Sequence, residues 1–216
     1  MADSFDRNKD VAELLALGPV IPVIVIEDEN TAVPMAQALV GGGLRVLEVT
    51  LRTPAGLPGI KRIAEEVPDA VVGAGTVLTP ADVSATVAAG ARFLVSPGSS
   101  KELIRAMLDS GALPLPGTAT ASEVMALLDQ GLNHMKFFPA QPAGGVPYLK
   151  SLAGPLPMVR FCPTGGITPE TAPQFLALQN VACVGGSWML PADALAAGDW
   201  ARVRDLAQQA AGLGQT

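Results

Sequence analysis

The chain has 216 residues, of which 49% are hydrophobic and 16% are charged, and its mean hydropathy is +0.38. This composition is typical of a folded domain with a large core and excludes a mainly disordered chain. The net charge of −6 and the pI near 4.7 argue against a nucleic-acid partner, because a phosphate backbone needs a basic face. The longest apolar run, near residues 20–26, is broken by Pro22 and is too short to span a membrane.

The N-terminal segment and the cysteines indicate a compartment. The first ten residues are polar and mixed in charge, and they lack the basic start and apolar segment of a secretory signal peptide. Cys162 and Cys183 fall in separate strand-like runs without the spacing of metal ligands. We therefore expect free, reduced thiols in a cytoplasmic protein that does not enter a membrane.

Strand-like and helix-like segments alternate along the chain, after a short amphipathic helix over residues 10–17. The predicted strands cover 20–26, 45–50, 70–73, 92–96, 113–115, 134–138, 158–162 and 181–184. The predicted helices cover 31–40, 55–67, 80–89, 101–110, 122–130, 146–152, 169–178 and 200–210, with a short extra helix over 190–196.

This alternation predicts the fold class. Strands that alternate with helices pair in parallel, because a helix is needed to return the chain. About eight such units in a chain of this length favour a closed (β/α)8 barrel, the TIM barrel, over an open doubly wound sheet. No linker or low-complexity segment interrupts the pattern, so we predict one α/β domain over residues 1–216 with a short N-terminal helix.

One predicted strand carries an unusual lysine. Residues 134–138 are apolar and aromatic around Lys136, and the burial of an ammonium group without a partner is costly. Such a lysine reaches solvent from an edge strand, pairs with a buried carboxylate, or acts as a reactive amine. The rest of the chain has to decide between these interpretations.

A carboxylate on another strand can reach the same interior. Active sites in such barrels lie at the C-terminal ends of the strands. Because side chains alternate along a strand, Lys136 shares a face with Phe138, and Glu48 shares a face with Val46. Lys136 and Glu48 would then form a buried structural ion pair or a catalytic pair, and the position of active sites in this fold favours the catalytic pair.

Glycine turns follow the last two predicted strands, at Thr164-Gly165-Gly166 and at Gly185-Gly186-Ser187. In barrels, a phosphate commonly binds to backbone N–H groups of these two loops, and glycine lets the backbone approach the anion. Thr168 fits the N-cap of the following helix and Pro169 its first position. These features predict a phosphate site.

Other kinds of site lack support in the sequence. His134 is the only histidine, which argues against a His-rich metal centre and a Ser-His-Asp triad, and we expect it to pack rather than to react. No Walker-type loop is present, and Gly73-Ala74-Gly75 lacks the third glycine of a dinucleotide fingerprint. We therefore expect neither a metal nor a cofactor.

These parts allow one kind of chemistry. Burial in an apolar pocket disfavours the ammonium form of a lysine, and the free amine can attack a ketone to form a Schiff base. Glu48 is the available acid and base, Arg52 has the fork shape that suits a carboxylate, and Thr76 could add a hydroxyl. The implied substrate is a phosphorylated keto acid that is cleaved or joined at a carbon–carbon bond.

Seven blocks occur in order along the predicted strands and their loops, at Glu48–Thr53, Val72–Val77, Ser96–Gly98, Lys136–Ala140, Gly144–Gly145, Val159–Ile167 and Gly185–Trp188. Together they resemble the 2-keto-3-deoxy-6-phosphogluconate (KDPG) aldolases, the class I aldolases of the Entner–Doudoroff pathway. The similarity extends from about Val11 to the last helix. Three loop positions depart from the usual family pattern, namely Ser99, Thr118 and Gln141.

The resemblance implies a (β/α)8 barrel, usually a homotrimer, that cleaves the phosphorylated keto-deoxy acid to pyruvate and glyceraldehyde 3-phosphate. It implies that Lys136 forms the Schiff base and that Glu48 carries protons. Nine further residues would bind substrate: Arg52 and Thr76 its carboxylate, Pro97 and Phe138 the wall of the pyruvate pocket, Thr164 the face of the aldehyde, and Gly165, Gly166, Gly186 and Ser187 its phosphate.

Other functions remain open from the sequence. The family often also cleaves 4-hydroxy-2-oxoglutarate, and a sister aldolase would act on the galactonate epimer. A phosphosugar isomerase or epimerase would more often rely on histidine or metal centres. A non-catalytic barrel that only binds phosphosugars would not need both Lys136 and Glu48.

Overall fold

The computed structural model describes residues 7–214. All of its paired strands run in parallel. The strands are β1 (Val20–Ile24), β2 (Val46–Thr50), β3 (Val71–Gly75), β4 (Phe93–Val95), β5 (Leu113–Leu115), β6 (Gly117–Thr118), β7 (His134–Phe137), β8 (Arg160–Pro163) and β9 (Val184–Gly186). Six of them pair in the order β5-β4-β3-β2-β1-β9, and three pair in the order β6-β7-β8.

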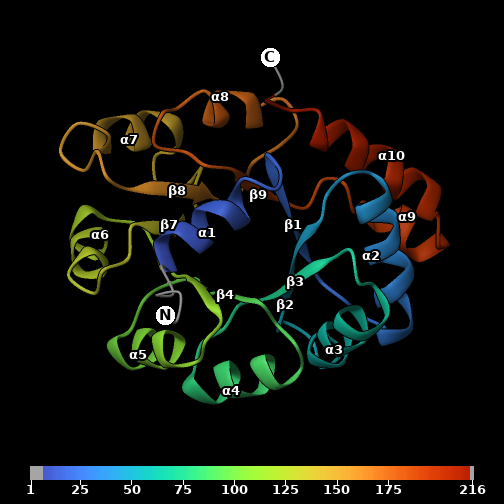
Figure 1. Cartoon of the computed structure of the whole chain (residues 1–216). Helices are drawn as coiled ribbons and strands as arrows, with labels where there is room; N and C mark the ends of the chain where they lie inside the picture. The colour runs from blue at the N-terminus through green and yellow to red at the C-terminus, as the bar shows by residue number, and fades with distance from the viewer. Residues whose placement is uncertain (1–6, 215–216) are drawn as a thin grey trace, which may run out of the picture.

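Helices return the chain between the strands. They are α1 (Arg7–Leu15), the 3-10 turn η1 (Glu29–Thr31), α2 (Ala32–Gly41), α3 (Gly56–Glu66), α4 (Pro80–Ala88), α5 (Lys101–Asp109), α6 (Ala121–Leu128), α7 (Gly145–Leu152), α8 (Ala172–Leu176), α9 (Ala192–Ala197) and α10 (Trp200–Ala211). Figure 1 shows the strands at the centre, the later helices around them, and α1 across one end. Between residues 7 and 214, no helix has the length and apolar character to cross a membrane.

The two sheets curl around one centre and meet at both borders (Figure 1). On one side, only Pro116 separates β5 from β6, and its carbonyl accepts the Lys136 N–H at 2.9 Å. On the other side, single parallel bridges join Phe161 to Val181 and Thr164 to Gly185. The result is an α/β fold with a curled parallel sheet.

The buried apolar residues form two clusters. The larger one fills the space between the strands and the outer helices and includes Leu47 on β2 and Phe137 on β7. The smaller one lies inside the curled sheet, where α1 covers it with Val11, Leu14 and Leu15. The predicted alternation of faces is confirmed, because Val46 belongs to the inner cluster while its neighbour Leu47 belongs to the outer one.

The last strand lies later in the chain than predicted. We expected it over residues 181–184, but β9 covers Val184–Gly186. Gly185 and Gly186 have no side chain to mark them as strand residues, yet they pair with Ile21 and Pro22 of β1. The fifth predicted strand similarly continues beyond Pro116 as β6, which contains Thr118.

The expected start of the helix predicted over residues 169–178 is also wrong. Thr168 was predicted as an N-cap, but α8 begins only at Ala172, with Thr171 in the cap position. The Thr171 hydroxyl accepts the Thr168 N–H at 2.9 Å, and the Thr168 carbonyl accepts the Thr171 N–H at 3.1 Å. These bonds form a separate turn that delays the helix, so α8 is shorter than predicted.

Candidate active site

Lys136 and Glu48 meet inside the curled sheet. Lys136 Nζ lies 3.1 Å from Glu48 Oε1, and the two side chains are only 5% and 3% exposed. Lys136 comes from β7 and Glu48 from β2, which belong to different sheets. The solvent-exposed edge-strand interpretation of Lys136 is therefore wrong.

The lysine backbone is fixed from the neighbouring strand. Gly117 of β6 is the register partner of Lys136, and the Thr118 hydroxyl donates to the Lys136 carbonyl at 3.2 Å. Lys136 Nζ also lies 5.2 Å from the centre of the Phe138 ring, which is half-buried. The amine thus lies between a carboxylate and an aromatic face.

Pro97 lies on the other side of β6. A Cβ atom at Gly117 would overlap the Pro97 carbonyl and lie 2.5 Å from the Ser96 oxygen, so this glycine lets the loop after β4 approach the strand. The Ser96 hydroxyl donates to the Gly98 carbonyl at 2.6 Å and accepts the Gly117 N–H at 3.4 Å. Pro97 itself is exposed, one strand away from Lys136.

Thr164 lies buried at the end of β8, beside Gly185. A Cβ atom at Gly185 would overlap the Thr164 hydroxyl and lie 3.1 Å from its Cβ. The Thr164 carbonyl accepts the Ala140 N–H at 2.8 Å, which links this strand end to the segment after Phe138.

The two glycine loops present free backbone donors. Gly165 and Gly166 have φ values of 107° and 73°, in the region that favours glycine. In the part of the chain that the structure describes, the N–H groups of Gly165, Gly166 and Ser187 donate to no protein acceptor. Gly186 is buried against Trp188, whose ring would clash with any larger residue, and Ser187 is exposed. Such unpaired N–H groups can bind an anion.

Arg52 and Thr76 follow β2 and β3 at the same edge. The neighbouring residues are joined, because the Leu51 N–H donates to the Gly75 carbonyl at 2.9 Å. Arg52 is exposed, and Thr76 has a φ of 59°. Neither side chain has a hydrogen bond to Lys136 or Glu48, so the structure brings them to the same edge without joining them to the pair.

Two glycines have a packing role here that the sequence analysis did not predict. Gly75 leaves space for the Glu48 side chain, and Gly185 leaves space for Thr164. The Gly-Ala-Gly pattern of β3 was a usable signal, since it puts two glycines on one face of a strand.

Beside the pair and toward the N-terminal ends of the strands, the interior also contains Cys162, the register partner of Lys136, together with Cys183 and His134. The hydrogen bond with Cys162 and burial raise the pKa of the Cys183 thiol, and both cysteines are free. Burial and the nearby Arg160 charge lower the pKa of His134, whose Nδ1 has no hydrogen-bond partner. Within residues 7–214, no three His, Cys, Asp or Glu side chains form a possible metal site.

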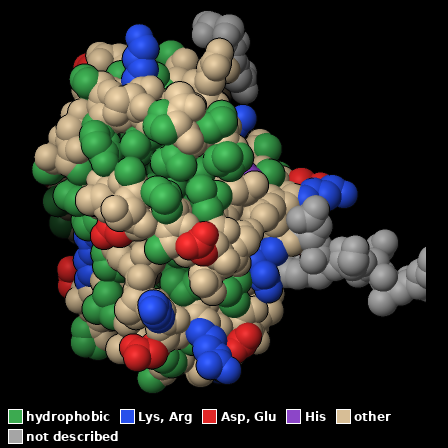
Figure 2. Space-filling model, turned by 90° about the vertical axis from the view of Figure 1, so that its left-hand side faces the viewer, with side chains coloured by type: hydrophobic (Ala, Val, Ile, Leu, Met, Phe, Trp, Pro, Cys, Tyr) green, Lys and Arg blue, Asp and Glu red, His purple; other side chains and the backbone are tan. Residues whose placement is uncertain are grey.

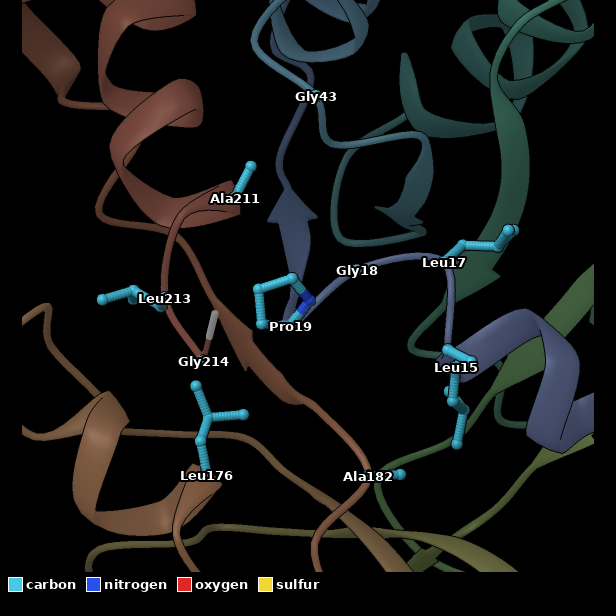
Figure 3. Close-up of a pocket in the computed structure, with 11 residues that line it drawn as sticks. Leu15, Leu17, Gly18, Pro19, Gly43, Leu176, Ala182, Ala211, Leu213 and Gly214 are labelled. Atoms are coloured by element: carbon cyan, nitrogen blue, oxygen red, sulfur yellow. The ribbon is translucent and has the colours of Figure 1, made fainter. Parts of the chain in front are cut away.

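A separate pocket lies at the opposite end of the strands. Figure 3 shows Pro19 at its centre, with Leu15 and Ala182 on one side and Gly214 on the other. None of the predicted site residues lines this pocket. The candidate site is therefore the C-terminal edge of the strands, around Lys136 and Glu48.

The chain is similar to known proteins along most of its length. The family model described as KDPG and KHG aldolase matches residues 11–206. The KHG/KDPG aldolase of Escherichia coli (strain K12) is 54% identical over 198 residues, which cover 91% of this chain and 92% of that protein.

Two solved structures are similar along nearly their whole length. The KDPG aldolase of Legionella pneumophila, with pyruvate captured at low pH as a covalent carbinolamine intermediate, is 47% identical with a TM-score of 0.91, covering 93% of this chain and 98% of that one. The aldolase of Zymomonas mobilis ZM4 with 3-phosphoglycerate is 49% identical with a TM-score of 0.91, covering 97% and 98%. The chain described here belongs to the KDPG and KHG aldolase family.

Proposed function

We propose that the protein is a class I aldolase that cleaves 2-dehydro-3-deoxy-6-phosphogluconate to pyruvate and D-glyceraldehyde 3-phosphate, in the Entner–Doudoroff pathway. The observation that carries this proposal is the buried contact of 3.1 Å between Lys136 Nζ and Glu48 Oε1. A ketone needs an amine nucleophile and a nearby group that moves protons, and this pair supplies both.

The first half of the reaction builds the Schiff base. Glu48 takes a proton from Lys136, and the free amine attacks the C2 ketone to give a carbinolamine. Glu48 then returns a proton to the C2 hydroxyl, which leaves as water and gives an iminium ion. The low exposure of both side chains keeps bulk water away from these proton transfers.

The second half breaks the carbon–carbon bond. Glu48, which is a carboxylate again after the dehydration, takes the C4 hydroxyl proton directly or through a water, the C3–C4 bond breaks, and its electron pair moves toward the iminium nitrogen. The aldehyde leaves, and the remaining enamine takes a proton at C3 with Glu48 as the donor. Water then hydrolyses the iminium, which releases pyruvate and restores the amine of Lys136.

The other residues at this edge bind the substrate in the proposal. Arg52 and Thr76 hold the pyruvate carboxylate, and Pro97 and Phe138 form the wall around its methyl group. Thr164 selects the face of the aldehyde. Gly165, Gly166, Gly186 and Ser187 bind the phosphate, and the unpaired N–H groups of Gly165, Gly166 and Ser187 support this role.

The same proposal covers the architecture. We infer a single domain over residues 1–216 with the strands closed into a (β/α)8 barrel, supported by the bridges at Thr164–Gly185 and Phe161–Val181.

We also infer a homotrimer. Figure 2 shows hydrophobic side chains gathered on the side of α6 and α7, and Met125 and Met158 are 57% and 52% exposed. The free cysteines support a cytoplasmic location.

Borohydride trapping with pyruvate, followed by peptide mass spectrometry, tests the proposal. The expected result is a reduced pyruvyl adduct on the peptide that contains Lys136. A folded protein without any adduct would rule out the Schiff-base mechanism. A coupled assay with the phosphorylated keto acid and its galactonate epimer then decides which substrate is cleaved, and we expect the gluconate compound to be preferred.

A second substrate is favoured by the family description, which includes KHG aldolases. 4-Hydroxy-2-oxoglutarate shares the keto acid part and lacks the phosphate, so it uses the same pair without the glycine loops. We expect cleavage to pyruvate and glyoxylate at a lower kcat/KM. A non-catalytic barrel that only binds phosphosugars would cleave neither compound.

A further inference from the structure

The interior face of β3 has no side chains at two successive positions. Gly73 and Gly75 both point into the curled sheet, while Ala74 between them belongs to the outer cluster. Each glycine faces one large group from a neighbouring strand. A Cβ atom at Gly73 would lie 2.5 Å from Cγ of Phe93, and one at Gly75 would lie 2.7 Å from Cγ and 2.9 Å from Cδ of Glu48.

Backbone geometry does not explain these two glycines. Neither of them has a positive φ, so the strand conformation at both positions accepts any L-residue. Their register partners are Glu48 for Gly73 and Thr50 for Gly75, in an unbroken ladder between β2 and β3. The absence of a Cβ at these positions therefore leaves room for a neighbouring side chain. At Gly75 that room is occupied by the Glu48 carboxylate, which contacts Lys136.

We propose that Gly75 is a positioning residue for proton transfer: the missing side chain lets the Glu48 carboxylate lie against β3, where it reaches the Lys136 amine. The inference rests on the proposed function and deepens it, since it states which strand sets the position of the proton carrier. A methyl group at residue 75 overlaps Oε1, the same oxygen that contacts Nζ. Glu48 then has to turn away from the lysine.

The two halves of the chemistry separate this role from a structural one. The amount of Schiff base present at equilibrium depends mainly on Lys136, because the proton carrier changes only how fast it forms, whereas the rate at which the pyruvate methyl protons exchange with solvent depends on the proton carrier. For Gly75→Ala we expect borohydride trapping with pyruvate within about three-fold of wild type, and methyl exchange in D2O at saturating pyruvate slower by roughly 10–10². Proton exchange is followed by NMR.

A double-mutant cycle tests whether the effect passes through Glu48. Glu48→Gln alone slows the exchange by roughly 10²–10⁴. If Gly75 acts only by placing this side chain, Glu48→Gln with Gly75→Ala exchanges at the Glu48→Gln rate within about two-fold, because the two changes remove the same interaction. Effects that multiply would overturn the proposal.

Gly73→Ala is the matched control on the same face of the same strand. Its methyl group meets the Phe93 ring rather than a reacting group, so we expect a lower Tm and unchanged exchange per folded molecule. If Gly75→Ala itself does not fold, Gly75→Ala with Glu48→Ala decides, because removal of the carboxylate frees the space. Failure of that double variant to fold, when Glu48→Ala alone folds, contradicts the proposal.

The outcomes also separate this inference from the proposed function. A wild-type protein that traps no pyruvate would remove the Schiff-base function itself. A wild-type protein that traps and exchanges, beside a Gly75→Ala variant that exchanges at the same rate, would overturn only the role of Gly75. A variant with weaker pyruvate binding but a normal saturated exchange rate would indicate an effect through neighbouring Thr76, and it would equally overturn the inference.

Discussion

The C-terminal and N-terminal halves of the strands enclose two different interiors. At the C-terminal half, called the upper half below, Lys136 and Glu48 bring two ionisable groups together at 3.1 Å, and Thr164 directly follows β8 at the same edge. At the N-terminal half, called the lower half below, the same strands contribute an apolar cluster that α1 covers. A single strand passes through both regions, because β7 carries His134 in the lower half and Lys136 two residues later in the upper half.

The difference shows how one set of strands separates stability from chemistry. In the lower half, the hydrogen bond with Cys162 and burial raise the pKa of Cys183, and burial and the Arg160 charge lower the pKa of His134, which favours the neutral forms of both groups. The upper half contains a charge only where a partner and a glycine make room for it. Substitutions in the two halves should therefore affect different measurements.

The largest expected effect comes from removal of the amine. Lys136→Met keeps most of the side-chain volume, and we expect turnover to fall by more than about 10⁴-fold because the nucleophile is lost. Glu48 then remains buried without its partner, which costs roughly 3–5 kcal/mol of unfolding free energy.

Addition of Glu48→Gln to Lys136→Met separates the two effects of this pair. Most of the lost unfolding free energy should return, because no buried charge is left alone, while activity stays absent. Denaturant unfolding and a coupled pyruvate assay measure the two quantities. Recovery of activity in the double variant would show that the reaction does not use the pair.

The next effect concerns proton transfer alone. Glu48→Gln keeps the size of the side chain and removes its ability to act as a base, so exchange of the pyruvate methyl protons should slow by roughly 10²–10⁴. Pyruvate should still bind, as measured by calorimetry. An unchanged exchange rate in this variant would assign proton transfer to another group and leave Glu48 with a structural role.

Much of the upper half was predictable from the sequence, because its residues have distinctive side chains. Alternation along a strand predicted the shared interior of Lys136 and Glu48, and the ion pair confirms that they meet. The family resemblance is confirmed by the family match. The roles of the nine substrate-binding residues stay predictions.

The remaining features depend on backbone pairing and on packing between distant residues, which the pattern of side chains along the sequence does not show. Gly185 and Gly186 read as a loop because glycine gives no period-two signal, although backbone pairing with β1 makes them a strand. The function of Gly75 is visible only once Glu48 is seen to occupy the space beside it. Thr168 has a good local capping sequence, but its bonds with Thr171 form a separate turn before α8.

A substitution on the buried face of α1 should affect only the lower half. Leu15 is 1% exposed in the inner cluster, and Leu15→Ala should lower the unfolding free energy by roughly 2–5 kcal/mol through the cavity that it leaves. Leu17→Ala, at a residue that is 44% exposed, is the matched control with an effect of less than about 0.5 kcal/mol. We expect kcat for the folded fraction to be unchanged in both. A large loss of kcat in Leu15→Ala would show that the two halves are coupled.

The smallest effect concerns His134 and pH. Burial, together with the Arg160 charge, lowers the pKa of His134 from its ordinary value of 6.5. As pH falls below about 6.5, the unfolded chain therefore binds a proton that the folded chain does not, and this group's contribution to stability is lost toward its folded pKa. The unfolding free energy should decrease by at most about 1.4 kcal/mol per pH unit from this group.

His134→Asn removes the titration and serves as its own test. Between about pH 6.5 and 5, above the range in which ordinary carboxylates titrate, the unfolding free energy of the variant should change less steeply than that of wild type. Urea denaturation at several pH values measures both slopes. Equal slopes would mean that His134 takes up its proton as readily in the folded chain as in the unfolded one, and the lower half would then tolerate a charge as the upper half does.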